Sequence, residues 1–351
     1  MRVLYFNPQP LSPVPEDQDF VALLREAARQ HQVSLIQVVP GGEVGRYRLS
    51  ALRSVVQEFV ELGPPPAGLV LPMMQASETD DAAFEYLDER RLDLYLETFE
   101  RELGRLAGRL RPDLVHVNYL WLGAAMARSV LPSTPVVVSA HDLDLVLAER
   151  TPGLARRVTP PARELQRVFA ATSGSAKAVG RVHGIRSDRL QIVGRGVDTL
   201  RFHPPETTAS AAFAQVVEEH TLRLPRRPAL RIVYLGSAGD PGLPALITVL
   251  RRLCPVGGGV IAVLLVEGAP AAVRALREGI PTDAEIYTLN QPTSGVRAGL
   301  FRGSHLVVPR GVSTFVLQRA VEAVACGCRV NLVDDPALGV WPPAEFARGG
   351  G

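Results

Sequence analysis

The chain has 351 residues, of which 46% are hydrophobic and 21% are charged. This apolar content excludes a disordered chain, and at roughly 150 residues per domain the length predicts two domains. The 38 basic and 36 acidic residues give a formal net charge of +2, which argues against a protein whose affinity depends on nucleic-acid phosphates. Lys177 is the only lysine, so all the other basic residues are arginine.

The number of cysteines and the length of the apolar runs indicate where in the cell the protein is located. The three cysteines, Cys254, Cys326 and Cys328, are too few and wrongly spaced for a disulfide framework or a four-ligand zinc site. The sequence MRVLYFNPQP reaches proline before an apolar stretch of signal-peptide length, and the longest apolar run, residues 260–266, is far below the roughly 20 residues that span a bilayer. We therefore expect a cytoplasmic protein, and peripheral contact with the inner membrane face stays open.

Short apolar runs alternate with longer amphipathic segments, a pattern typical of βαβ units and a parallel sheet. The first half of the chain shows this alternation up to about residue 193. Strands are expected at residues 2–6, 33–39, 114–117, 135–139, 168–172 and 190–193, and helices at about 20–27, 81–110, 121–130, 162–167 and 176–183.

The same alternation restarts after a segment rich in Thr, Ala and Glu. Strands are expected at residues 231–235, 259–266, 286–289, 306–308 and 329–333, with helices at 243–253, 271–277 and 314–324. The pattern predicts an α/β protein of two doubly wound, Rossmann-like halves that face each other across a cleft. We expect one domain at residues 1–205, a linker at 206–227 and a second domain at 228–351.

The strand expected at 306–308 and the helix after it suit an anionic ligand. A helix that follows a strand presents free N–H groups and a favourable dipole to phosphate, and ligands of open α/β sheets bind beyond the carboxyl ends of the strands. Ser313 or Thr314 is a natural N-cap of that helix, and Glu322 lies about two turns further on. In the first half, Asp142 and Asp144 fit capping groups better than a metal site.

Four stretches together resemble the family 4 type of retaining glycosyltransferase with the two-domain GT-B fold. One is RPDLVHV and the next is TPVVVSAHD, each typical of a strand that ends in a histidine. A third runs from ATS to IVGRGVD and FHP, and the fourth combines SHLVVP with EAVACG. In chain order they lie at residues 111–117, 134–142, 171–204 and 298–330.

The resemblance implies an acceptor-side first domain and a second domain that binds a nucleotide-sugar donor without a bound metal or other cofactor. It places His141 near the donor sugar and the reacting centre, and His116 on the acceptor side. It makes Glu322 a ligand of the ribose hydroxyls. The remaining donor-binding residues are then Ser313, Thr314, Gly236 and Arg310.

Structural roles compete with these functional ones. Glu322 could be a solvated helix residue, His141 a capping or core-edge histidine, and for His116 the structural role is favoured.

The sequence departs from the family pattern in the donor half. The family has two glutamates with seven residues between them, but counting back from Glu322 gives Thr314, or Ser313 after a one-residue shift. Where the family has an arginine after the first strand of this half and a lysine five residues later, this chain has Ser237 and Gly242.

No lysine of the donor half can replace that cation, since Lys177 lies in the other half. By position, the substitutes are Arg195, Arg302 and Arg310. The chain ends at Gly351, about 20 residues after its last expected strand, so the second domain is expected to be truncated.

Two function hypotheses follow. The first is transfer of a hexosyl unit, with retention, from a UDP- or GDP-sugar to a glycan, lipid-linked or small-molecule acceptor. The second is a catalytically impaired glycosyltransferase-like protein that acts as a binding or partner subunit, or a truncated gene product. A GT-B epimerase or phosphorylase fits the fold but has no motif in its favour. The oligomeric state is not predicted.

Overall fold

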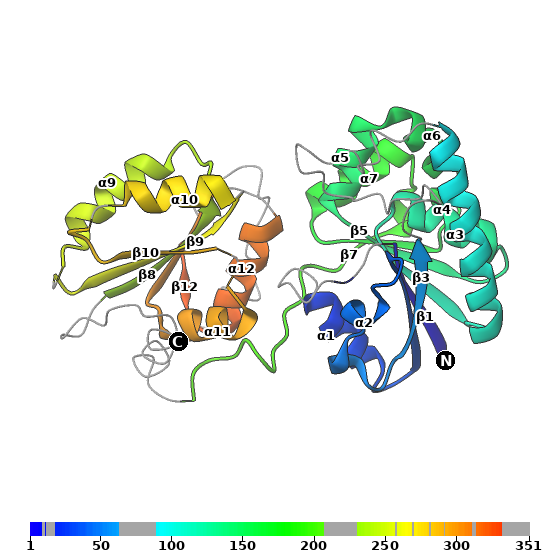
Figure 1. Cartoon of the computed structure of the whole chain (residues 1–351), viewed down its shortest axis with the longest axis horizontal. Helices are drawn as coiled ribbons and strands as arrows, with labels where there is room; N and C mark the ends of the chain where they lie inside the picture. Colours follow the sequence, from blue (N-terminus) through cyan, green and yellow to red (C-terminus); the bar gives the residue numbers. More distant parts are fainter. Residues whose placement is uncertain are drawn as a thin grey trace. The chain divides into compact units, whose positions relative to one another are not determined.

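The computed structural model describes residues 1–8, 11, 18–62, 89–206, 230–256, 258–268, 270–280, 282–290, 292–310 and 314–331. The chain divides into two compact units, of which the first ends at Gly194 and the second begins at Arg195. Each unit is a sheet with helices on both of its faces (Figure 1). The prediction of two doubly wound α/β halves is therefore confirmed.

The described part of the first unit forms a seven-stranded parallel sheet in the order β3-β2-β1-β4-β5-β6-β7. Its strands are β1 (Arg2–Asn7), β2 (Gln32–Pro40), β3 (Val56–Leu62), β4 (Leu114–Asn118), β5 (Val136–Ala140), β6 (Arg167–Ala170) and β7 (Leu190–Ile192). Its helices are α1 (Gln18–Ala27), α2 (Val44–Tyr47), α3 (Glu89–Leu110), α4 (Trp121–Val130), α5 (Asp142–Arg150), α6 (Pro152–Ala162) and α7 (Ser173–His183), with short 3-10 turns at Ser50–Leu52 and Ser187–Arg189.

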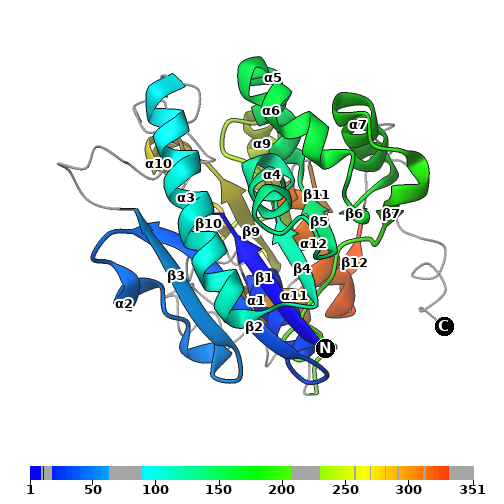
Figure 2. The same ribbon diagram turned by 90° about the vertical axis from the view of Figure 1, so that its right-hand side faces the viewer.

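Strand β1 shows why this sheet is covered on both faces. Successive side chains of a strand point to opposite sides, so a strand buried on both faces is apolar at every position. Val3 and Tyr5 pack in the core on the α1 side, whereas Leu4 and Phe6 pack in the larger core that α3 and α4 cover. Figure 2 shows α3 running across that second face, where the rings of Phe6 and Phe99 lie 5.2 Å apart.

The order of the strands creates a switch point in the first sheet. β1 has β2 on one side and β4 on the other, so the chain winds away from β1 in both directions. At such a point the carboxyl ends of the two central strands leave a crevice in which open α/β sheets bind ligands. Phe6 pairs with Val117, which puts Asn7 and Asn118, the last residues of β1 and β4, next to each other.

The second unit repeats this plan with fewer strands. Its described residues form a five-stranded parallel sheet in the order β10-β9-β8-β11-β12, with the switch point between β8 and β11. The strands are β8 (Leu230–Ser237), β9 (Val260–Glu267), β10 (Ile286–Asn290), β11 (Leu306–Pro309) and β12 (Arg329–Val330), and the helices are α9 (Leu243–Leu253), α10 (Pro270–Gly279), α11 (Ser294–Gly303) and α12 (Thr314–Ala325).

Strand β8 again divides its side chains between two cores. Val233 and Leu235 pack with α11 and α12, whereas Tyr234 packs with α9 and α10. The segment after Gly194 also belongs to this unit, because Phe202 is buried in the α11–α12 core. Gln318 donates to the Gly196 carbonyl at 2.9 Å, and so the chain is attached to α12 well before residue 205.

The chain thus joins the second unit at Arg195, ahead of the domain boundary predicted at residue 205. The linker at 206–227 stays a prediction, since 207–229 lie outside the described residues. Four elements of the structure have no counterpart among the predicted ones: α2, β3, α5 and α11. A helix was expected at 162–167, but α6 ends at Ala162 and β6 begins at Arg167.

Candidate functional site

Three polar side chains meet at the switch point of the first sheet. Asn7 ends β1, Asn118 ends β4, and His141 follows β5. The Nδ2 of Asn118 donates to Oδ1 of Asn7 at 3.0 Å, and Nε2 of His141 lies 2.9 Å from Oδ1 of Asn118. Asn7 and Asn118 are 1% and 5% exposed, whereas His141 is half-buried. Hydrogen bonds thus link the ends of β1 and β4 to the predicted catalytic histidine, which follows β5.

Asp144 fixes the backbone around this cluster. Its buried carboxylate accepts from the backbone N–H groups of His141 at 2.7 Å, Leu120 at 3.1 Å and Trp121 at 2.9 Å. A carboxylate is favourable there because the first N–H groups of a helix have no partner within the helix. Asp144 therefore joins the start of α4 to the start of α5, and its predicted capping role is confirmed.

Tyr119 has a backbone conformation that is rare for its residue type. Its φ is 87°, and the only other non-glycine residue with positive φ in the described part of the chain is Arg111. The Tyr119 N–H donates to the Ser139 carbonyl at 3.0 Å, which holds the turn after β4 against β5. The Tyr119 ring lies against that of His141, with 4.5 Å between centroids.

His116 lies on β4, deeper in the same region. Its Nε2 is 2.9 Å from Oγ of Ser139, and its ring packs between those of Tyr5 and Phe169 at centroid distances of 5.0 and 5.8 Å. Burial, with a smaller contribution from His141, lowers the pKa of His116 to about 4. These contacts suit a neutral, packed histidine, and its acceptor-side role stays a prediction.

Arg310 lies at the switch point of the second sheet, directly after β11. Its Nε donates to Oδ2 of Asp240 at 2.8 Å, and its side chain is 51% exposed. Asp240 also accepts from the Tyr234 hydroxyl at 3.0 Å and from the Gly242 N–H at 2.7 Å. Burial raises the pKa of Asp240, but the hydrogen bonds from Gly242, Tyr234 and Arg310 outweigh it and keep that pKa below its ordinary value.

Gly242 leaves room for this guanidinium. A Cβ built on Gly242 would lie 2.8 Å from Cζ of Arg310, so any larger residue would displace the arginine. A Cβ on Gly236, at the end of β8, would similarly lie 2.7 Å from carbons of the Tyr234 ring. Of the three arginines considered as substitutes, Arg310 is the one directly after β11, whereas Arg302 donates to the carbonyl of His203 at 3.1 Å.

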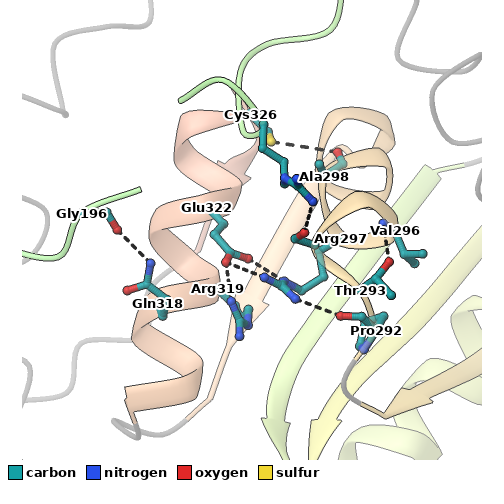
Figure 3. Close-up of polar contacts among 12 residues, drawn as sticks. Gly196, Pro292, Thr293, Val296, Arg297, Ala298, Gln318, Arg319, Glu322 and Cys326 are labelled. Carbon is teal, nitrogen blue, oxygen red and sulfur yellow. Dashed lines mark hydrogen bonds and ion pairs between the residues drawn. The ribbon is translucent and has the colours of Figure 1, made fainter. Parts of the chain in front are cut away.

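Glu322 lies in the interior of the second unit (Figure 3). Arg297 binds it with two hydrogen bonds, from Nε to Oε2 at 2.8 Å and from Nη2 to Oε1 at 2.9 Å. Nη1 of Arg319 also donates to Oε1. The side chains of both arginines are 2% exposed and that of Glu322 is 0% exposed. The alternative of a solvated helix residue is wrong, and the contact with ribose stays a prediction.

Of the two predicted donor-binding residues at the start of α12, the structure describes one. Thr314 begins α12 as expected, whereas Ser313 lies outside the described residues. Sequence reasoning missed Asn7, Asn118 and Asp240. The available signal for the two asparagines was a polar residue at the last position of an apolar strand.

Within the described ranges, no group of three or more His, Cys, Asp or Glu side chains is arranged to hold a metal ion. Over the same ranges, every helix is either too short or too polar to cross a bilayer.

Solved structures share this architecture. HepE from Anabaena in complex with UDP matches with a TM-score of 0.58 and 14% identity, over 94% of this chain and 80% of that chain. WaaG, a glycosyltransferase involved in lipopolysaccharide biosynthesis, matches with a TM-score of 0.57 and 14% identity over the same shares. The two parallel-sheet units define a GT-B fold.

The family follows from the sequence itself. A model of Glycosyltransferase Family 4 matches residues 20–201, which is just over half of the chain. The chain belongs to glycosyltransferase family 4. It is also 29% identical over 281 residues to the D-inositol 3-phosphate glycosyltransferase of Rhodococcus erythropolis. That match covers 73% of this chain and 61% of the relative, so the chain spans about three fifths of that protein's length.

Replacing Glu322 by alanine should destabilise the second unit. Two buried guanidinium groups would lose their carboxylate, and breaking a buried ion pair from one side costs about 3–5 kcal/mol. Urea denaturation should show this loss, whereas Glu278→Ala on the exposed side of α10 should change the free energy of unfolding by less than about 0.5 kcal/mol. Equal stability of the two variants would contradict the structural role of Glu322.

The buried histidines predict a loss of stability in mild acid. Burial lowers the pKa of His116 to about 4 in the folded protein, from an ordinary value of 6.5 in the unfolded chain. The unfolded state therefore binds more protons between these values, and the free energy of unfolding falls as the pH is lowered through them, by up to about 1.4 kcal/mol per pH unit.

Urea denaturation at pH 4 to 7, followed by circular dichroism, measures this slope. His116→Phe should reduce it but not abolish it, because burial also lowers the pKa of His183 to about 4. An unchanged slope in His116→Phe would show that His116 is not the titrating group.

Proposed function

We propose that the protein is a glycosyltransferase that moves a hexosyl unit from a UDP- or GDP-sugar to an acceptor, with retention at the anomeric carbon. Family membership supports glycosyl transfer. The observation that carries the proposal is that each unit holds a half-buried or exposed basic side chain at the switch point of its sheet, His141 in the first and Arg310 in the second. Such edges are where open α/β sheets bind their ligands.

In the first unit, His141 is proposed to contact the donor sugar at the reacting centre. Its backbone is held by Asp144 and its ring by Asn118 and Tyr119, so the imidazole is oriented before a substrate arrives. His116 is proposed to shape the acceptor side as a buried residue behind His141, since it is only 9% exposed.

In the second unit, Arg310 is proposed to bind the donor diphosphate and to stabilise the leaving group. A guanidinium forms strong, paired hydrogen bonds with phosphate oxygens, and these gain strength as charge develops on the leaving group. The space that Arg310 fills beside Gly242 is the position at which the family resemblance expects a lysine. The N-terminus of α12 at Thr314, with Ser313 and Gly236, completes the proposed donor side.

Similar proteins support the donor and acceptor classes. HepE from Anabaena has been solved with UDP-glucose as well as with UDP, which supports a uridine nucleotide sugar as donor. The Rhodococcus relative is named for D-inositol 3-phosphate, which supports a small phosphorylated polyol as acceptor. Both assignments are proposals for this chain.

A binding or partner subunit without catalysis remains the second candidate. The observation that favours it is the enclosure of Glu322 by Arg297 and Arg319, because the carboxylate proposed to bind ribose is engaged with two buried cations. Binding and turnover experiments separate the two candidates.

Arg310→Ala should weaken UDP binding about 10- to 100-fold, since it removes a charge-assisted hydrogen bond to phosphate. Isothermal titration calorimetry with UDP and GDP measures this. The matched control is Arg251→Ala, which breaks another exposed arginine–aspartate pair of the same unit, with Asp283 at 2.9 Å, and should leave affinity unchanged. Wild-type protein that binds neither nucleotide at millimolar concentration would overturn the donor assignment.

His141→Ala should lower turnover on the order of 100-fold while leaving UDP affinity unchanged, because the ring is proposed to contact the sugar and not the nucleotide. A screen of nucleotide sugars for hydrolysis or transfer provides the assay. His31 directly precedes β2, at the amino edge of the same sheet, so His31→Ala is the matched control. Turnover by the wild type excludes the partner-subunit candidate, and full activity of His141→Ala excludes the proposed role of that histidine.

A further inference from the structure

The last residue of β4 and the first residue of the turn after it both contact the His141 ring. We propose that Asn118 and Tyr119 are positioning residues for His141, Asn118 by fixing the proton on Nε2 and Tyr119 by fixing the plane of the ring. The proposal rests on the proposed function of His141 in glycosyl transfer. The bond to Asn118, the tilted ring contact with Tyr119 and the backbone conformation of Tyr119 carry it.

The orientation of the Asn118 amide determines the tautomer of His141. Its Nδ2 donates to Oδ1 of Asn7 at 3.0 Å, so the atom that faces Nε2 of His141 at 2.9 Å is its carbonyl oxygen. A carbonyl oxygen can only accept, and the neutral ring must therefore carry its proton on Nε2. Because Asn7 and Asn118 are almost fully buried, water does not compete for these bonds.

The conformation of Tyr119 stores strain at this site. A non-glycine residue in the left-handed region is sterically disfavoured, and such residues persist only where their surroundings hold them. Here the Tyr119 N–H is bonded to Ser139, and Asp144 binds the next two N–H groups. Glycine at 119 would relieve the strain but would remove the ring that packs against His141.

Among the described residues, the titratable groups around His141 come from three segments. His116 faces it from β4, Asp144 binds its backbone N–H from α5, and the Tyr119 ring contacts it from the turn after β4. Asp144 is bonded to three backbone N–H groups, and His116 to Ser139. The group that contacts Nε2 of His141 is the uncharged amide of Asn118. Changing Asn118 to aspartate therefore places a negative charge next to Nε2 with little change in side-chain shape.

The tautomer can be measured without an activity assay. In the full chain labelled with 15N-histidine, the His141 signals are assigned by their loss in His141→Ala. We expect Nε2 to be protonated and Nδ1 unprotonated above the titration range. A ring protonated on Nδ1 would overturn the proposal, and this arm requires no Asn118 variant to fold.

Asn118→Asp tests the coupling. A carboxylate next to Nε2 stabilises the imidazolium, so the titration midpoint of His141 should rise by about one pH unit or more. Ser139→Ala is the matched control, since it removes the neighbouring bond to His116 and should leave the His141 midpoint within a few tenths of a unit. An unmoved midpoint in Asn118→Asp would overturn the role of Asn118.

Tyr119→Phe keeps the ring, and Tyr119→Gly removes both ring and strain. If Tyr119 positions the histidine, the glycine variant should lower turnover about 10-fold or more, while the phenylalanine variant should retain wild-type turnover. Equal turnover of the two variants would overturn the role of Tyr119.

The pH profile of turnover links both residues to the reaction. The Asn118→Asp profile should shift in the same direction as the His141 midpoint, and no shift should occur when residual turnover is measured in the His141→Ala background. A profile that stays in place while the NMR midpoint moves would overturn the catalytic consequence. If the wild type turns over no nucleotide sugar, the proposed function fails, whereas the NMR arm still decides how His141 is held.

Discussion

The buried carboxylate of Asp144 is the interaction on which the first unit's site depends. It accepts from three backbone N–H groups that belong to two different helix starts, and so it ties α4 to α5 beyond the sheet edge. A buried carboxylate needs such partners, because an ionised group without them costs several kcal/mol. The turn with Tyr119 and the position of His141 both follow from this one set of bonds. The position of the site residues is thus set mainly by hydrogen bonds of the backbone to Asp144.

The second unit uses charge in two contrasting ways. In its interior, Glu322 shares two guanidinium groups, one from α11 and one from its own helix. At its edge, Arg310 keeps half of its surface exposed while Asp240 holds it at one oxygen. Interior charges act mainly as structural contacts because removing either partner is costly, whereas a tethered surface cation stays available to an anionic ligand.

The sequence allowed most of the fold to be predicted, because buried parallel strands are continuous apolar runs. The bounds of α4 and α9 match their predictions. β3 was missed because this edge strand places Gln57, Glu58 and Glu61 among its apolar residues, and only two of its residues are buried. α11 was missed because three glycines interrupt it, although its buried face packs against α12.

A site residue could be predicted where its position depends on one strand alone. It could not be predicted where its contacts depend on two strands that are neighbours in the sheet. His141 follows an apolar run, so its place at the sheet edge could be inferred from local sequence. Its bond to Asn118, and the bond from there to Asn7, depend on β1, β4 and β5 being neighbours, which only the strand order reveals. Likewise Arg319 is three residues from Glu322, but Arg297 is 25 residues away and its role could not be inferred.

The glycine at 242 makes two positions of the second unit depend on each other. Arg310 reaches the space beside it from the neighbouring strand end, and a Cβ on residue 242 would lie 2.8 Å from Cζ of Arg310. The guanidinium is the far end of a half-exposed side chain, so a larger residue at 242 would turn it away from Asp240 and leave the backbone in place. The residue at 242 therefore determines whether Asp240 holds a cation at this sheet edge, and substitutions at 242 and 310 should not be additive.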